Sequence, residues 1–384
     1  MLLQEELNEL RAKDLYRSLR TLKPIDSTHA SCDGRELLLF CGNDYLGLSH
    51  HRRVIDAAKK AAEYSGVGAG AARLISGTSD LHTEFEEKIA RFKNKQRALV
   101  FSAGYLANLG VLTALAGEKD LILLDKLCHA SLIDGARLSG AALRVFPHKN
   151  YQKGEEILQA SAELRRRILV TDSIFSMDGD LADLAELVRL KEKYDCLLVV
   201  DDAHGTGVLG LNGRGAAEDE NLEEKIDVMT GTLSKTLGCL GGFAAASEDI
   251  IDYLINTSRP FIFATALPPM ICAGALEALH IIEELPELRY QLWRNIQRMH
   301  SGLAASGFET GPIQSPIFPV GIGSEKEALE ISEQLLNQGI LVPAVRYPTV
   351  PKGKARLRVT VSAAHSDEEI ERFIGALALC RQNR

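Results

Sequence analysis

Residues 197–207 read Leu-Leu-Val-Val-Asp-Asp-Ala-His-Gly-Thr-Gly, so an apolar run leads directly into carboxylates, a histidine and glycines. Four apolar residues without alternation are typical of a parallel strand that helices cover on both faces. The polar residues then fall at the carboxyl end of that strand, where open α/β sheets bind ligands. By themselves, Asp201 and His204 are as well explained by loop capping as by function. The stretch therefore predicts an α/β sheet and a candidate site at its edge.

Short apolar runs of the same kind lie on either side of this stretch. We expect strands at residues 97–101, 121–124, 143–146, 168–171, 197–200, 228–231 and 243–246. Helical patterns separate them, for example residues 181–194, where Leu184, Leu187 and Leu190 recur on one face. Alternation of strands and helices predicts a three-layer α/β domain with a mostly parallel sheet.

The last hundred residues have a different pattern. Helices are expected at about 288–305 and 325–338, strands at 340–345 and 357–361, and a final helix from Ser366, where Glu369 completes a capping box. This is typical of a smaller α+β domain. We expect residues 1–45 to form an N-terminal segment packed with the small domain, 46–270 a large cofactor-binding α/β domain, and 271–384 the small domain.

Composition excludes several classes of protein. The 384 residues are 46% hydrophobic and 25% charged, as in an ordinary globular enzyme. A net charge of −8 without a dense basic stripe argues against binding to nucleic acid or to an anionic membrane. We find neither a secretory signal nor an apolar run long enough to span a bilayer. Seven scattered cysteines without a C-x-x-C pair predict free thiols in a cytoplasmic protein, and no metal site.

Three motifs are set aside because each lacks part of its pattern. The glycines of residues 66–71 follow a helical pattern, whereas a dinucleotide fingerprint follows a strand. Residues 232–236 end like a phosphate-binding P-loop, but Ser234 stands where that loop needs glycine. Residues 178–180 lack the rest of a calcium loop.

Two further sequence features indicate the same candidate site as Asp201. Lys235 follows another apolar strand and is surrounded by small hydroxyl residues and glycines, a setting that favours an amine nucleophile for Schiff-base chemistry. The strand at 97–101 opens into a helix near Gly104, and backbone N–H groups at a helix start bind phosphate. A Schiff-base lysine, a carboxylate for a ring nitrogen and a phosphate site are the contacts that pyridoxal 5′-phosphate (PLP) requires.

Several blocks of sequence resemble the α-oxoamine synthase family of fold-type-I PLP-dependent enzymes. The matching blocks are residues 42–48, 102–105, 129–131, 175–180, 201–207, 232–235 and 355–358. They extend over nearly the whole chain in the family's order. The resemblance implies the fold of a fold-type-I PLP-dependent transferase.

The resemblance also implies four catalytic residues. Lys235 carries the cofactor and acts as general acid and base, while Asp201 pairs with the pyridine nitrogen. His204 bonds the phenolic oxygen of the cofactor. His129 stacks on the ring face and contacts substrate, although a histidine simply packed near a helix start is the alternative.

Further cofactor contacts are implied at Ser176 near the phenolic oxygen and at Gly104, Tyr105 and Thr232 around the phosphate. Family members are homodimers with shared active sites, in which the neighbouring chain completes the phosphate site, here with Thr265. No metal is implied.

Substrate contacts are implied at Asn43 and Arg358, which bind the amino-acid carboxylate, since a guanidinium fork suits that group. Arg17 and Thr349 match further substrate positions, and Arg20 is an alternative to Arg17.

Members of the family condense an amino acid with an acyl thioester and release carbon dioxide. Ala72 stands where the 5-aminolevulinate synthases of this family, which use glycine, carry threonine, and alanine at this position leaves room for the methyl group of substrate alanine. We therefore expect L-alanine with pimeloyl-CoA or a pimeloyl carrier-protein thioester, and glycine with acetyl-CoA second. A PLP-dependent lyase or aldolase and a non-catalytic partner subunit remain as other classes.

Overall fold

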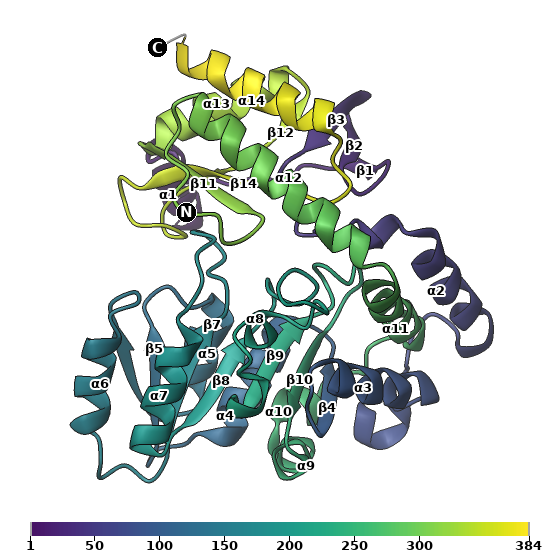
Figure 1. Cartoon of the computed structure of the whole chain (residues 1–384), viewed down its shortest axis with the longest axis vertical. Helices are drawn as coiled ribbons and strands as arrows, with labels where there is room; N and C mark the ends of the chain where they lie inside the picture. Colours follow the sequence, from purple (N-terminus) through teal and green to yellow (C-terminus); the bar gives the residue numbers. More distant parts are fainter. Residues whose placement is uncertain (1, 383–384) are drawn as a thin grey trace. The chain divides into compact units, whose positions relative to one another are not determined.

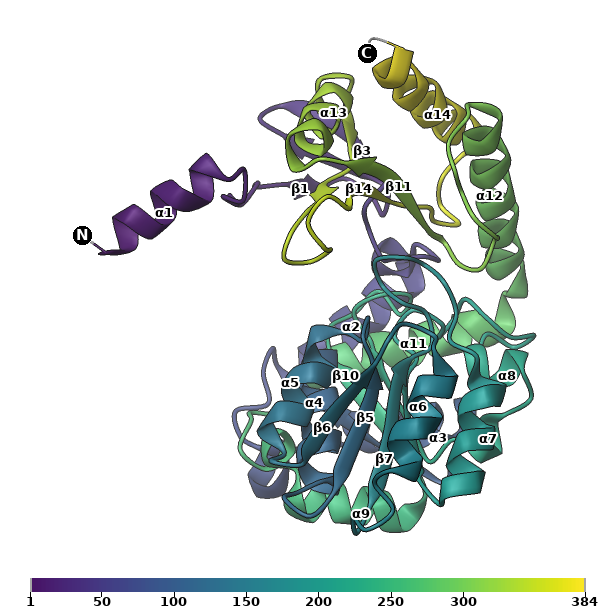
Figure 2. The ribbon, with the colours of Figure 1, turned by 90° about the vertical axis from the view of Figure 1, so that its left-hand side faces the viewer.

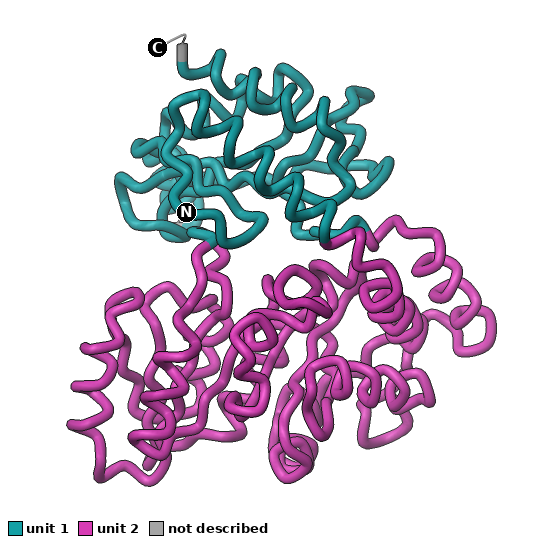
Figure 3. Tube along the Cα trace, viewed as in Figure 1, with its two compact units in different colours: residues 1–47, 177–179, 290–384 teal, residues 48–176, 180–289 magenta. Residues whose placement is uncertain are grey.

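The computed structural model describes residues 2–382 (Figure 1). The chain forms two compact units, coloured separately in Figure 3. Unit 1 comprises residues 1–47, 177–179 and 290–384, and unit 2 comprises residues 48–176 and 180–289. Each unit has its own sheets and is described separately.

A seven-stranded sheet forms the centre of unit 2. Its order is β4 (Arg97–Phe101), β10 (Gly242–Ala246), β9 (Val228–Thr232), β8 (Leu197–Asp201), β7 (Arg167–Asp172), β5 (Leu121–Asp125) and β6 (Ala142–Phe146). Strand β10 runs antiparallel to both of its neighbours, while β9, β8, β7, β5 and β6 are parallel. The sheet is therefore mostly parallel, as the alternating pattern predicts.

Helices cover both faces of this sheet. They are α2 (Arg52–Ser65), α3 (Asp80–Phe92), α4 (Gly104–Leu115), α5 (Ala130–Leu138), α6 (Tyr151–Gln159), α7 (Leu184–Tyr194), α8 (Ala216–Asp219), α9 (Glu248–Thr257), α10 (Arg259–Ile262) and α11 (Pro269–Glu284). Short 3-10 turns lie at Leu48–His50 and Glu223–Lys225, and a π-helical turn lies at Arg73–Gly77. Figure 2 shows the strands between α4 and α5 on one side and α6 and α7 on the other. Buried side chains such as Val111 of α4 and Ile122 of β5 fill the space between these layers.

Unit 1 contains two smaller sheets. One has the order β1 (Lys23–Pro24), β2 (His29–Cys32), β3 (Arg35–Leu39) and β12 (Ile340–Leu341), and the other β11 (Ile317–Gly323), β14 (Ala355–Thr360) and β13 (Ala344–Val345). Its helices are α1 (Leu2–Ala12), α13 (Glu325–Asn337), α14 (Asp367–Gln382) and the part of α12 (Pro286–Ala305) from Tyr290 onward. The predicted capping box is present, because Ser366 N donates to Glu369 Oε2 at 2.7 Å and Glu369 N donates to Ser366 Oγ at 3.2 Å.

The structure differs from the expectations at two places. The strand expected at 340–345 is wrong as one element, since β12 pairs with β3 and β13 with β14 in the other sheet. Pro343 between them has no N–H for a ladder. The small domain was expected from residue 271, but α11 packs on α2 and α3 and lies in unit 2. The units divide instead between Arg289 and Tyr290. No helix among residues 2–382 has the length and apolarity that crossing a bilayer requires.

Candidate active site

A cavity of about 250 Å³ lies in unit 2 at the carboxyl ends of β7, β8 and β9. Its lining consists of Ala103, Gly104, Tyr105, Asn108, His129, Ser131, Asp172, Asp201, Ala203, Gly231, Thr232, Ser234 and Lys235. Six residues predicted from the sequence are among them, from segments far apart in the chain. The parallel strands bring them together because their carboxyl ends meet at one edge of the sheet.

Lys235 and His204 face each other at this site. The Nζ atom of Lys235 lies 2.9 Å from Nε2 of His204. Backbone bonds from Leu233 N to Gly241 O at 2.9 Å and from Cys239 N to Leu233 O at 2.8 Å shape the turn that carries the lysine. An amine and an imidazole at hydrogen-bond distance can exchange a proton, which suits a general acid and base.

Asp201, the last residue of β8, is buried with 6% of its surface exposed. Its Oδ2 accepts a bond from Asn108 Nδ2 at 2.6 Å, and its Oδ1 accepts one from the backbone N–H of Ala203 at 3.0 Å. Two N–H donors thus keep the carboxylate in one orientation, and each oxygen retains a lone pair for a further donor.

A buried ion pair supports the loop after Asp201. Lys93 is fully buried, and its Nζ lies 2.7 Å from Asp202 Oδ2 and 2.7 Å from Thr206 Oγ1. Glycines at 205 and 215 permit this packing, because a Cβ at Gly215 would lie 1.7 Å from Asp202 Oδ2. The loop that carries Asp201 and His204 is therefore held in place by the Lys93–Asp202 ion pair and by glycines whose backbone lies close to Asp202.

His129 precedes α5 and caps its first turn. Its backbone N–H donates to Asp172 Oδ2 at 2.8 Å, and its Nδ1 lies 2.7 Å from Ser131 Oγ. Burial lowers the pKa of His129, and the charge of Lys235 lowers it further, while Asp201 acts in the opposite direction. Burial, together with the nearby Asp201, raises the pKa of Asp172 well above its ordinary value. A neutral imidazole at this position is suited to stacking on an aromatic ring.

The start of α4 forms a cradle beside the lysine. Within residues 2–382 no side-chain cap is found for this helix, whose first residue is Gly104, so its first N–H groups are available to a ligand. A Cβ at Gly104 would lie 2.9 Å from Thr232 Cβ, so only glycine permits this close approach. Uncapped N–H groups next to the Thr232 hydroxyl fit a phosphate. The lysine, the carboxylate and this cradle are thus within one cavity.

Three predicted cofactor residues of unit 2 lie outside the cavity lining, and one of them is His204, which contacts Lys235. Ser176 follows Phe175 in the loop after β7. Thr265 is exposed and forms an isolated bridge with Ala72. Thr265 was expected to serve a neighbouring subunit.

The predicted substrate residues belong to unit 1. Arg358 is buried, and its Nη2 donates to Asn43 Oδ1 at 3.1 Å. Arg17 lines a separate cavity of about 710 Å³ in that unit, together with Arg20. Thr349 is exposed, and its backbone N–H donates to Arg346 O at 3.0 Å.

Seven lining residues were not predicted, and four of them have polar side chains. Asn108 could have been identified from the sequence, because it is the one strongly polar side chain in the sequence of α4. Asp172 ends an apolar strand in the same way as Asp201 does, and that pattern was overlooked. Ser131 lay inside a recognised block, but nothing in its spacing indicated a role. Ser234 was noted only as a neighbour of Lys235.

Comparison with known proteins gives consistent results. The aminotransferase class I and II family model matches residues 35–377. A curated relative, the 8-amino-7-oxononanoate synthase of Geotalea daltonii, is 47% identical over 377 residues, which cover 97% of this chain and 96% of the relative.

Solved structures are also similar. A serine palmitoyltransferase from S. paucimobilis with a bound PLP–myriocin aldimine matches with a TM-score of 0.95 and 31% identity, covering 99% of this chain and 97% of that one. The 8-amino-7-oxononanoate synthase of Francisella tularensis matches with a TM-score of 0.79 and 30% identity, covering 90% and 98%. The chain therefore belongs to the aminotransferase class I and II family, within its α-oxoamine synthase group.

Proposed function

We propose that this protein is a PLP-dependent acyltransferase that condenses L-alanine with pimeloyl-CoA, or with a pimeloyl carrier-protein thioester. The products are 8-amino-7-oxononanoate, carbon dioxide and the free thiol, and the reaction belongs to biotin biosynthesis. The observation that carries the proposal is one cavity lined by Lys235, Asp201 and the uncapped start of α4, with His204 Nε2 at 2.9 Å from Lys235 Nζ. Curated relatives such as that of Geotalea daltonii have this activity in their names.

The cavity residues fit the cofactor by their chemistry. Lys235 supplies the amine for the aldehyde, Asp201 the acceptor for the pyridine N–H, and the first N–H groups of α4 with Thr232 the phosphate contacts. His129 and His204, with Ser176, supply the ring and phenolic contacts. Bound PLP supplies an electron sink for the bond broken at the amino-acid Cα.

The protein's own groups then direct the reaction. Arg358 and Asn43 bind the carboxylate of alanine and so orient its Cα–H bond. Lys235 takes that proton and later returns it, and His204, 2.9 Å from its Nζ, assists the transfer. Neutral His129, which lines the cavity, offers an uncharged ring face for stacking on the cofactor.

The choice of alanine rests on Ala72 and on the names of the relatives. The small side chain at position 72 leaves space for the substrate methyl group. One methyl group contributes only about 1–3 kcal/mol of discrimination, so glycine with acetyl-CoA is the second candidate.

We also propose a homodimer with shared active sites in the cytoplasm. Exposed apolar side chains of unit 2 support the dimer, among them Val67 at 78%, Ile75 at 81% and Phe263 at 69% exposure. Thr265 lies two residues beyond Phe263, and we assign it to the phosphate site of the neighbouring subunit. Free cysteines support a reducing compartment.

A matrix of substrates tests the function. Alanine, glycine and serine are each combined with pimeloyl-, acetyl-, succinyl- and palmitoyl-CoA, and release of free thiol is followed. We expect alanine with pimeloyl-CoA to be fastest and Lys235→Ala to abolish turnover. Preference for glycine with acetyl-CoA overturns the named reaction, and turnover without thiol release indicates a lyase.

A further inference from the structure

Asn108 is a buried amide within the apolar helix α4. Only 3% of its surface is exposed, and the helix reads Gly-Tyr-Leu-Ala-Asn-Leu-Gly-Val-Leu-Thr-Ala-Leu. A buried side-chain amide is costly unless its N–H₂ and its carbonyl both find partners. Its presence in this helix therefore calls for a specific set of contacts.

Those contacts satisfy both ends of the amide. Asn108 Nδ2 donates to Asp201 Oδ2 at 2.6 Å and to Ser131 Oγ at 2.8 Å, and Asn108 Oδ1 accepts from Thr230 Oγ1 at 2.6 Å. Thr230 and Ser131 are themselves fully buried. The opposite amide orientation would direct a carbonyl oxygen at the carboxylate of Asp201, so the charge of Asp201 selects the observed one.

The same network reaches His129. Because Ser131 Oγ accepts from Asn108, its own proton is free to be donated to Nδ1 of His129, 2.7 Å away. The backbone N–H of Ser131 also donates to that nitrogen, at 3.3 Å. Two donors on Nδ1 leave the ring proton on Nε2.

We propose that Asn108 is a positioning residue that fixes both the carboxylate of Asp201 and the tautomer of His129 for the cofactor. This inference rests on the proposed PLP-dependent function. The side-chain amide of Asn108 thus holds both Asp201, the partner of the pyridine nitrogen, and His129, the ring that stacks on the cofactor. Loss of the amide frees Asp201 to rotate and leaves Ser131 able to direct its proton elsewhere.

The test uses Asn108→Ala, with Thr113→Ala as a matched control. Thr113 also lies on α4, but its hydroxyl bonds the carbonyl of Leu109 within the helix at 2.6 Å. The readouts are the dissociation constant of PLP from the apoprotein by equilibrium dialysis, the pH midpoint of the visible absorbance of the holoenzyme, and kcat and KM for L-alanine.

With Asn108→Ala we expect the dissociation constant of PLP to rise about tenfold and kcat to fall about tenfold or more, with KM within about threefold. The absorbance midpoint should move up by about one pH unit. When Asp201 is no longer held in place, the pyridine nitrogen loses its proton, and a neutral ring no longer disfavours the positive charge on the protonated Schiff base. Thr230→Val, which leaves the carbonyl of Asn108 without its donor, should give smaller changes in the same directions. If Asn108→Ala does not fold, the measurements on Thr230→Val test the inference in its place.

Ser131→Ala separates the two parts of the network. It should lower kcat and leave the absorbance midpoint in place, since the bond from Asn108 to Asp201 remains. A kcat equal to that of Thr113→Ala overturns the role assigned at His129. An absorbance midpoint and PLP affinity of Asn108→Ala equal to wild type overturn the inference alone, whereas a wild-type protein that binds no PLP overturns the proposed function and the inference with it.

Discussion

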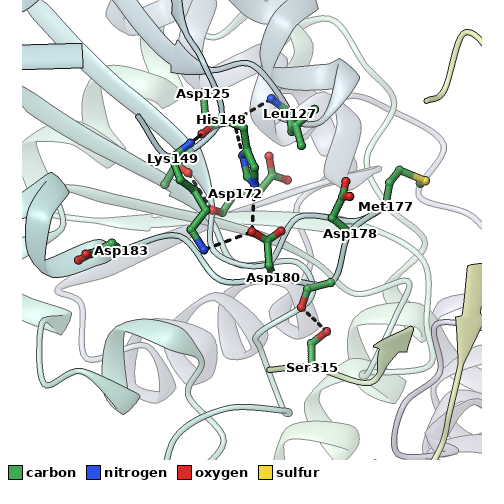
Figure 4. Close-up of polar contacts among 12 residues, drawn as sticks. Asp125, Leu127, His148, Lys149, Asp172, Met177, Asp178, Asp180, Asp183 and Ser315 are labelled. Atoms are coloured by element: carbon green, nitrogen blue, oxygen red, sulfur yellow. Dashed lines mark hydrogen bonds and ion pairs between the residues drawn. The ribbon is translucent and has the colours of Figure 1, made fainter. Parts of the chain in front are cut away.

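His148 is bonded through both ring nitrogens to carboxylates, and this makes its removal a quantitative test. Nδ1 lies 2.9 Å from Asp125 Oδ1 and Nε2 lies 2.9 Å from Asp180 Oδ2 (Figure 4). Lys149 Nζ lies 3.2 Å from the same oxygen of Asp180. Only the protonated ring donates at both nitrogens, so the geometry requires a cation between the two acids.

The expected magnitude follows from the pKa of His148. Burial disfavours its charge, but the hydrogen bonds to Asp125 and Asp180 outweigh burial and raise the pKa from 6.5 to about 9. A shift of that size corresponds to about 3 kcal/mol. With 26% of the side chain exposed, solvent screening reduces this, and we expect about 1–2 kcal/mol of stability.

The sign of the pH dependence is fixed by the direction of the shift. Because the folded pKa is the higher one, the stabilisation is fully present below about pH 6.5 and is lost as the pH rises through about 9. The variant His148→Gln should therefore melt about 1–3 °C below wild type at pH 6.5, and the gap should close by about pH 10.

The assay is thermal unfolding of the apoprotein by far-ultraviolet circular dichroism at several pH values. His300→Gln is the matched control, because the ring of His300 bonds a backbone carbonyl, that of Gly311, at 2.9 Å. Its difference from wild type should not follow this pH course. A gap for His148→Gln that is constant from pH 6.5 to 10 refutes the charged bridge.

Three further predictions concern the site and its support. Gly104→Ala places a Cβ 2.9 Å from Thr232 Cβ, so we expect the dissociation constant of PLP to rise at least tenfold, measured by dialysis; unchanged affinity contradicts the cradle at α4. Lys93→Met leaves Asp202 buried without its cation and should cost about 3–5 kcal/mol, seen as a lower denaturant midpoint, with part of the loss restored by adding Asp202→Asn; no loss refutes the anchoring role. Arg358→Lys loses the planar fork that binds a carboxylate, so KM for L-alanine should rise about tenfold or more while the cofactor spectrum stays unchanged; an unaltered KM removes Arg358 from the substrate site.

Local patterns were sufficient for most elements of the fold. Short Leu-rich or β-branched runs located all seven strands of the large sheet within one residue at each end. Several of these runs are continuously apolar, as expected of strands that helices cover on both faces. The capping box at Ser366 was likewise visible, since its bonds join residues three apart. The break at Pro343 was missed, because which strands β12 and β13 pair with depends on residues far away in the chain.

The residues of the candidate site can likewise be divided into those that a local pattern reveals and those that only tertiary contacts reveal. The sequence by itself determined the residue types that PLP chemistry requires, Lys235, Asp201 and the glycine at 104, since these follow strands or open a helix. Only the tertiary structure decided that Asn108 bonds Asp201 and that His148 lies between two acids. Those contacts join residues of separate helices, strands and loops, and hydrogen bonds depend on distances of a few tenths of an ångström that no local pattern records.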